Sequence, residues 1–152
     1  MIAVMTFRWT TIVVGSVLLA ALAAACGDSP VAPSTAPYKQ TDVRPGTGSE
    51  ATVGALVTVN YTGWLYDAAK LDGKGLQFDT SVGATPFAFT LGASQVIAGW
   101  DRGVAGMKVG GLRRLIIPPS LAYGPVRNGP IPPDATLVFD IELTDVQTAA
   151  AQ

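Results

Sequence analysis

Residues 94–107 read SQVIAGWDRGVAGM, and the spacing of the apolar side chains in this stretch indicates the one helix of the predicted fold. They recur at intervals of three and four residues, which places them on one face of a helix. These side chains are Val96, Ile97, Trp100 and Val104. We therefore predict a helix over Gln95–Met107 with Ser94 as its N-cap. Each glycine inside it weakens a helix by up to about 1 kcal/mol relative to alanine, so the helix depends on packing against another element.

The remainder of the folded region is dominated by the patterns of β-strands. Apolar and polar residues alternate in VTVNYT (57–62) and LVFDIELT (137–144), which is the period of a half-buried strand. LRRLII (112–117) is a further strand that ends at a proline pair, and shorter strands are predicted at FAF (87–89) and over Tyr38–Val43. The sequence therefore predicts an α+β fold, in which a twisted antiparallel sheet of about five strands curls over one short helix.

Composition excludes several classes of function. Only 14% of the 152 residues are charged and the formal net charge is -1, so we expect no nucleic-acid partner. The chain has no histidine and one cysteine, which leaves no base for nucleophilic catalysis and no His/Cys cluster for zinc. Asp67 and Asp72 are too sparse for a calcium loop. Asp79 with Asp140 or Glu142 is a candidate carboxylate pair, but Asp140 and Glu142 alternate outward on their strand, which favours a solvated strand face.

The N-terminus has the pattern of an export signal. Arg8 is the only charge before Asp28, and Ile12–Ala25 is an unbroken run of apolar and small residues. This run is shorter than the roughly 20 residues that span a membrane, which favours a signal peptide. The following segment GDSPVAPSTAP is typical of a flexible tether. The predicted organisation is a signal peptide (1–25), a lipidated cysteine and tether (26–37), a folded domain (38–146) and a disordered tail (147–152).

Cys26 follows the apolar run directly, in LAAAC (22–26), which resembles the lipobox of bacterial lipoproteins. The resemblance implies cleavage before Cys26 and acylation of its thiol, which would anchor the protein to the bacterial cell envelope, facing the periplasm or the exterior. Ala23 stands where the lipobox usually has leucine, so two alternatives stay open: ordinary cleavage after Ala25, which gives a secreted soluble protein, and an uncleaved anchor. The single cysteine excludes an intrachain disulfide.

Large aromatic side chains are spread over separate predicted elements. They are Tyr61, Phe78, Phe87, Phe89, Trp100, Tyr123 and Phe139. Core packing explains each of them when it is taken alone. Tyr123 and Ile131, however, lie in the long proline-rich loop 118–134, where side chains more often line a surface concavity than fill a core.

Six segments, taken in order, resemble the FKBP-type peptidyl-prolyl cis-trans isomerases. They are VNYTGWL (59–65), FDTS (78–81), PFAFTLG (86–92), QVIAGWDRGVAGMKVG (95–110), LAYG (121–124) and IPPDATLVFDIEL (131–143). The resemblance covers residues 38–146. It implies a sheet that curls over one helix, with an apolar pocket between them, and an enzyme that accelerates rotation about X-Pro bonds, here in exported proteins.

The resemblance also implies roles for single residues. Trp100 is the expected pocket floor and Asp79 the one charged residue of its wall. The backbone N–H of Ile97 and the hydroxyl of Tyr123 are expected to donate hydrogen bonds to ligand carbonyls. The implied catalytic residues are Tyr61, Asp79, Ile97, Trp100 and Tyr123, and the implied substrate-binding residues are Phe78, Phe87, Val96, Ile131 and Phe139. No metal or cofactor is implied.

The expected chemistry needs no acid or base. The barrier to X-Pro rotation is about 20 kcal/mol because the nitrogen lone pair is delocalised into the carbonyl, and a dry pocket removes the water that favours the planar, polar amide. The expected partners are proline-containing polypeptides, with macrolides such as tacrolimus or rapamycin as inhibitors. The alternative is a non-catalytic module that binds proline peptides or macrolides in the same pocket.

The chain departs from compact members of the family at two places. More residues separate Gly63 from Phe78, so we expect the polar segment 67–77 to form a bulging loop. The flap between Tyr123 and Ile131 is short and leaves no room for the extra domain of chaperone members. The tether is too short for the helical arm of dimeric members, so we expect a monomer.

Overall fold

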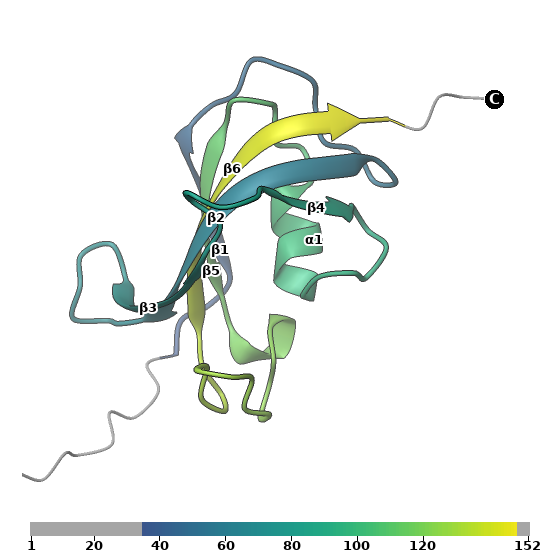
Figure 1. Ribbon diagram of the computed structural model, residues 1–152. Coiled ribbons are helices and arrows are strands. Elements are labelled where there is room, and N and C mark those ends of the chain that lie inside the picture. The colour runs from purple at the N-terminus through teal and green to yellow at the C-terminus, as the bar shows by residue number, and fades with distance from the viewer. Residues whose placement is uncertain (1–34, 149–152) are drawn as a thin grey trace, which may run out of the picture. The chain divides into compact units, whose positions relative to one another are not determined.

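The computed structural model describes residues 35–148, and Figure 1 shows how their elements are arranged. The strands are β1 (Lys39–Arg44), β2 (Leu56–Tyr66), β3 (Lys74–Thr80), β4 (Phe87–Thr90), β5 (Leu112–Ile117) and β6 (Leu137–Gln147); the helices are α1 (Ala98–Val104) and a short 3-10 helix (Pro119–Leu121). The predicted signal peptide, Cys26 and the tether up to residue 34 lie outside the described residues, as do residues 149–152 of the predicted tail. No helix within residues 35–148 is long and apolar enough to cross a membrane.

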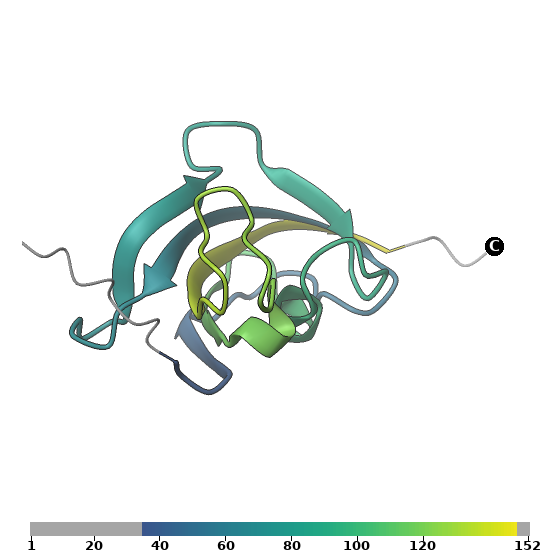
Figure 2. The ribbon, with the colours of Figure 1, turned by 90° about the horizontal axis from the view of Figure 1, so that it is seen from below.

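All six strands belong to one antiparallel sheet. The order is β1-β5-β6-β2-β3, and β4 pairs with the first half of β2 while β3 pairs with its second half. In Figure 2 the long strands arch around the side of the sheet on which α1 lies. The predicted fold, an antiparallel sheet over one short helix, is therefore confirmed, with one strand more than the alternation indicated.

The additional strand, β3, lies partly in the segment 67–77 that we expected to be a loop. It is an edge strand whose residues are all exposed or half-buried, and its backbone pairs with β2. Neither of its faces is buried, so its sequence, KGLQFDT, carries no alternation of apolar and polar residues. β2 itself continues past Gly63 to Tyr66, and Gln147, placed in the predicted tail, is the last residue of β6.

The helix is shorter than predicted and begins differently. It spans the seven residues Ala98–Val104, its N-cap is Ile97, and no side chain caps it. The prediction that Ser94 is the N-cap is wrong, because Ser94 lies in a turn with a positive φ of 55° and precedes the helix by four residues. The residues before Ala98 form an irregular loop.

Two glycines explain why α1 packs closely on β5. A Cβ atom at Gly99 would lie 2.4 Å from Ile117, and one at Gly103 would lie 2.4 Å from Leu115. Both distances are shorter than any real carbon–carbon contact, so only glycine allows this approach. The residues that lower the intrinsic helix propensity are thus the ones that permit the helix to pack.

A buried arginine ties the end of α1 to the sheet. Arg113 of β5 donates through Nη1 to the carbonyls of Gly103 (2.9 Å) and Ala105 (3.2 Å), and its remaining nitrogens bind the carboxylate of Asp42 on β1. The cation sits where the helix dipole is negative and its last carbonyls lack partners. This contact fixes α1, and with it Trp100, relative to the strands.

A second ionic cluster lies on the opposite face of the sheet from Arg113, and it corrects the interpretation of Asp140 as a solvated residue. Its carboxylate accepts hydrogen bonds from Arg114 (2.7 and 3.0 Å) and Lys74 (2.7 Å), and only 16% of its side chain is exposed. Burial opposes the charge, but these hydrogen bonds outweigh it and hold the pKa of Asp140 below its ordinary value. Glu142 pairs with Arg44, so neither residue forms a carboxylate pair.

Candidate active site

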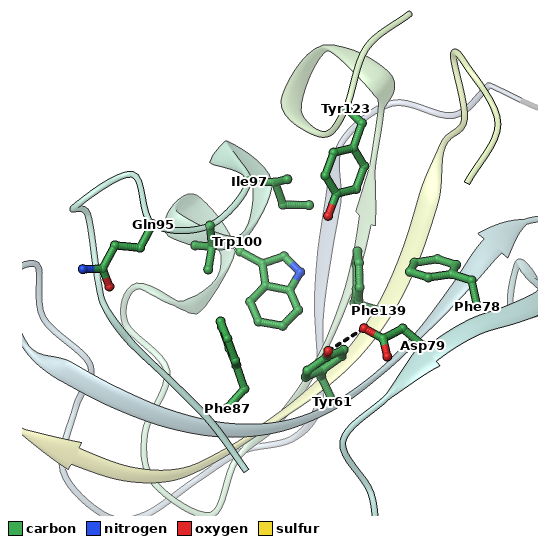
Figure 3. Close-up of a pocket in the computed structure, with 10 residues that line it drawn as sticks. Tyr61, Phe78, Asp79, Phe87, Gln95, Ile97, Trp100, Tyr123 and Phe139 are labelled. Carbon is green, nitrogen blue, oxygen red and sulfur yellow. Dashed lines mark hydrogen bonds between the residues drawn. The ribbon is translucent and has the colours of Figure 1, made fainter. Parts of the chain in front are cut away.

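A pocket of about 190 Å³ opens between α1, the curved sheet and the loop after the 3-10 helix. Its lining comes from five strands or helices and two loops, as Figure 3 shows. The lining residues are Tyr61, Phe78, Asp79, Phe87, Gln95, Val96, Ile97, Trp100, Tyr123 and Phe139. Asp79 is the only charged residue among them, so the wall is mainly aromatic and aliphatic.

Trp100 both belongs to the core and lines the pocket. It is 5% exposed, and its ring meets Tyr61 and Phe139 edge-on at centroid distances of 5.0 and 5.2 Å. Its indole Nε1 is buried and makes no hydrogen bond within the described part of the chain. A buried donor without a partner is costly, and the close aromatic packing around Trp100 offsets that cost.

Tyr61 and Asp79 form a short hydrogen bond between two side chains of the wall. The Tyr61 hydroxyl donates to Oδ2 of Asp79 at 2.6 Å, and the backbone N–H of Thr80 donates to the other carboxylate oxygen at 2.8 Å. Burial, followed by the hydrogen bond to Asp79, raises the pKa of Tyr61 to about 12. Tyr61 is therefore a neutral donor at physiological pH, and its proton is held by Asp79.

Two further groups supply donors at the other side of the pocket. Figure 3 shows the Tyr123 hydroxyl pointing into the space above Trp100. Burial, and then the negative charge of Asp79, raises the pKa of Tyr123, so this phenol also keeps its proton. The carbonyl of Ile97 accepts the first hydrogen bond of α1 from Trp100 at 2.9 Å, whereas its N–H has no partner among residues 35–148. A peptide carbonyl in the pocket would therefore find free donors.

The structure places Ile131 apart from the other predicted site residues. Ile131 is 5% exposed, belongs to the hydrophobic core and is not part of the pocket lining. Its backbone bonds to that of Asn128 in both directions, which closes the flap into a tight turn and points the side chain inward. All the other predicted catalytic and substrate-binding residues line the pocket.

Gln95 lines the pocket and was not predicted from the sequence. Its Oε1 accepts a hydrogen bond from the backbone N–H of Thr90 at 2.8 Å. The sequence signal was its position directly before Val96 and Ile97, but a polar residue at the start of an expected helix is ordinarily solvated. Only the pairing of its amide with β4 places it at the wall.

The arrangement can bind, orient and dehydrate a peptide, and it is poorly suited to move a proton. The phenols of the wall remain protonated, and the only carboxylate is occupied by the Tyr61 hydroxyl. Within residues 35–148 no three His, Cys, Asp or Glu side chains cluster closely enough to hold a metal ion. The chemistry available is therefore the placement of hydrogen-bond donors around an amide in an aromatic cavity.

Known proteins resemble this chain over the same region. The sequence signature of the FKBP-type peptidyl-prolyl cis-trans isomerase family matches residues 48–144. The chain is 48% identical to FK506-binding protein 1 of Gibberella zeae over 110 residues, which cover 71% of this chain and 96% of that protein. It is 47% identical over 107 residues to an FK506-binding protein of Neisseria meningitidis serogroup B, with 69% of this chain and 92% of that protein covered.

A solved structure agrees with these matches. The crystal structure of FkpA from Escherichia coli aligns with a TM-score of 0.61 at 40% sequence identity, and the alignment covers 81% of this chain. It covers 54% of the FkpA chain, so this chain spans about half the length of that protein. The pocket, the family signature and the extent of identity lead to one conclusion: the chain belongs to the FKBP-type family and is a peptidyl-prolyl cis-trans isomerase.

Proposed function

We propose that this enzyme accelerates X-Pro rotation in exported polypeptides by holding the amide, twisted, in the aromatic pocket. The observation that carries the proposal is the wall around Trp100, which offers hydrogen-bond donors and a single, already paired carboxylate. A planar X-Pro amide is polar because its nitrogen lone pair is delocalised, and twisting removes that polarity. An aromatic cavity solvates the planar form less well than water does, which favours the twisted form.

The donors select the twisted geometry. The Ile97 N–H and the Tyr123 hydroxyl lie on neighbouring parts of the wall and can bind the carbonyls that flank the proline. Interactions made fully only in the twisted state lower the barrier, whereas equal binding of both states does not. Because no proton is transferred, we expect kcat/KM to lack the bell-shaped pH dependence of acid–base catalysis.

The alternative function is a module that binds proline peptides in this pocket without catalysing their cis-trans isomerisation. The two are separated by an assay in which a protease cleaves only the trans form of a short X-Pro peptide. We expect the folded protein to accelerate the slow phase of cleavage in proportion to its concentration. A folded, peptide-binding protein that leaves this phase at the uncatalysed rate would establish the binding module instead.

We also propose that macrolides occupy the pocket. The relatives from Gibberella zeae and Neisseria meningitidis are named FK506-binding proteins, and most pocket residues here were anticipated from that family resemblance. Tacrolimus or rapamycin should therefore inhibit the isomerase competitively. Inhibition that does not relax as the peptide concentration rises would place the macrolide at another site.

The location proposed is the bacterial cell envelope, with the protein a monomer anchored through an acylated Cys26. The support is the LAAAC segment and the Pro/Ser/Ala-rich stretch that follows it. Mass spectrometry of the mature N-terminus from membranes tests this: we expect a diacylglyceryl cysteine at position 26. A mature chain that starts at an unmodified Cys26 in the soluble fraction would instead establish the secreted form, and Cys26→Ser serves as the processing control.

A further inference from the structure

One wall of the pocket is an irregular loop, residues 91–97, which we call the wall loop. It connects β4 to α1 and brings Gln95, Val96 and Ile97 to the pocket. It contains Ser94, whose positive φ of 55° is unusual for a residue with a side chain. Such a conformation persists only where surrounding contacts hold it. The contacts that hold the wall loop therefore set the positions of its pocket-lining residues.

The side chain of Asp101, in the first turn of α1, supplies these contacts. Its Oδ1 accepts a hydrogen bond from the backbone N–H of Gly92 at 2.9 Å, and its Oδ2 accepts one from the N–H of Ser94 at 3.2 Å. No side chain caps the helix at Ile97, and the Asp101 carboxylate binds amides of the preceding loop. Hydrogen bonds to a charged acceptor are the stronger kind, and two of them from one group restrict the loop on both sides of Ala93.

Asp101 also connects the two parts of the site that must act together. It follows Trp100, the pocket floor, by one residue, and it grips the loop that carries the Ile97 N–H. On the opposite side, the Gln95 amide holds the wall loop to the end of β4 through the N–H of Thr90. The wall loop is thus pinned to the helix at one point and to the sheet at another.

We propose that Asp101 is a positioning residue for the isomerase: its carboxylate holds the wall loop so that the Ile97 N–H faces the amide bound above Trp100. The inference rests on the proposed mechanism, in which that N–H binds a flanking carbonyl. Asp101 does not touch the substrate. Without it, Ser94 leaves its left-handed conformation more readily and the donor is misplaced in a fraction of the molecules.

The test compares Asp101→Ala with Asp67→Ala as a matched control. Asp67 also accepts a hydrogen bond from a backbone N–H in a loop, that of Ala69 at 2.9 Å, but its loop does not line the pocket. We expect Asp101→Ala to lower kcat/KM for a short X-Pro peptide by about tenfold, since a misplacement of about 1 Å can cost more than this. We expect Asp67→Ala to retain the wild-type value, with similar melting temperatures for the two variants.

Two further variants test the role of Asp101 even if Asp101→Ala folds poorly. Asp101→Asn keeps the shape and one oxygen, so its kcat/KM should lie between those of the wild type and Asp101→Ala, even if the alanine variant folds poorly. Ser94→Gly added to Asp101→Ala should restore part of the lost kcat/KM, because glycine adopts a positive φ without strain.

The outcomes separate this inference from the proposed function. An inactive wild-type protein would refute the isomerase mechanism itself. An active wild type with Asp101→Ala and Asp101→Asn within about twofold of it would refute the role of Asp101 alone, since a tenfold loss is expected. A loss of activity that only follows the unfolded fraction would mean that Asp101 stabilises the fold and does not position the wall loop.

Discussion

At the scale of single residues, the pocket depends on side chains that also belong to the core. Trp100 is the central case, because it is nearly buried, touches several aromatic rings and still lines the cavity. Phe89 is equally buried and packs beside Trp100, yet it does not line the cavity. Substituting Trp100 and Phe89 in turn therefore distinguishes a residue that contributes to ligand binding from one that contributes only to the stability of the fold.

We predict that Trp100→Leu weakens the binding of a proline peptide or macrolide, in addition to any effect on the melting temperature. The dissociation constant should rise about tenfold or more, because a large aromatic anchor is lost from the centre of the site. Phe89→Leu should lower the melting temperature and leave binding nearly unchanged. Calorimetry of binding and thermal unfolding measure both quantities; a Trp100→Leu effect confined to the melting temperature would make Trp100 a core residue only.

The raised pKa of Tyr61 predicts how the stability of the fold changes with pH. Its pKa of about 12 in the folded protein lies above the ordinary value of 10.0, so the unfolded chain releases this proton first. The stability that Tyr61 contributes is complete below about pH 10 and is lost as the pH rises toward about 12. We predict that the melting temperature of Tyr61→Phe falls less steeply over this range than that of the wild type. Equal slopes would contradict the raised pKa.

At the scale of elements, the close packing of α1 on β5 determines how Gly103→Ala changes the stability of the protein. Helix propensity alone predicts the opposite sign. Replacing Gly103 by alanine favours an isolated helix by about 1 kcal/mol. In the folded protein the new Cβ would lie 2.4 Å from Leu115, which is fully buried and cannot move aside freely. Overpacking of this kind costs about 1–3 kcal/mol, so the packing cost outweighs the gain in propensity.

We therefore predict that Gly103→Ala lowers the free energy of unfolding by about 1 kcal/mol. Leu115→Val shortens the side chain that the new Cβ would meet, so Gly103→Ala should cost less in that background than in the wild type. Denaturant unfolding of the two single variants and the double variant measures this coupling. A stabilising Gly103→Ala would mean that the helix can shift away from the sheet.

At the scale of the whole folded domain, ion pairs join strands that are distant in the sequence. Asp140 on β6 binds Arg114 on β5 and Lys74 on β3, and the Lys74 ammonium also lies 4.1 Å from the centroid of the Trp64 ring on β2. Side chains from four strands therefore contact one another around the Asp140 carboxylate. Since the pKa of Asp140 is lowered in the folded protein, ionised Asp140 stabilises the fold at neutral pH.

We predict that Asp140→Asn lowers the melting temperature at neutral pH by about 4 °C or more, as expected for a loss of about 1 kcal/mol in a domain of this size. The stabilisation by Asp140 is present above the ordinary pKa of 3.8 and is lost as the pH falls through the lower folded value. The difference between wild type and variant should therefore shrink in acid. Asp145→Asn, an exposed change on the same strand, is the control and should have little effect at any pH.

The elements that could be predicted from the sequence are those whose signal is local. The alternation in β2 and β6 reflects faces that are buried against the helix, and the spacing of Trp100 and Val104 reflects the buried face of α1. Each pattern arises because neighbouring residues of one element share one environment. The aromatic residues of the pocket could be anticipated for a related reason, since they stand in motifs that resemble one family.

Features that depend on partners far along the chain could not be predicted from the sequence and required the folded structure. β3 forms because an edge strand needs only the backbone of β2, so its exposed side chains carry no pattern. Ile131 turns into the core because the flap closes on Asn128, and Asp140 is buried because Arg114 and Lys74 approach it from other strands. The helix begins at Ala98 and not at Gln95, since residues 91–97 form the wall loop, which the Asp101 carboxylate holds through the N–H groups of Gly92 and Ser94. In each case the deciding free energy comes from contacts between elements, which no periodicity within one element records.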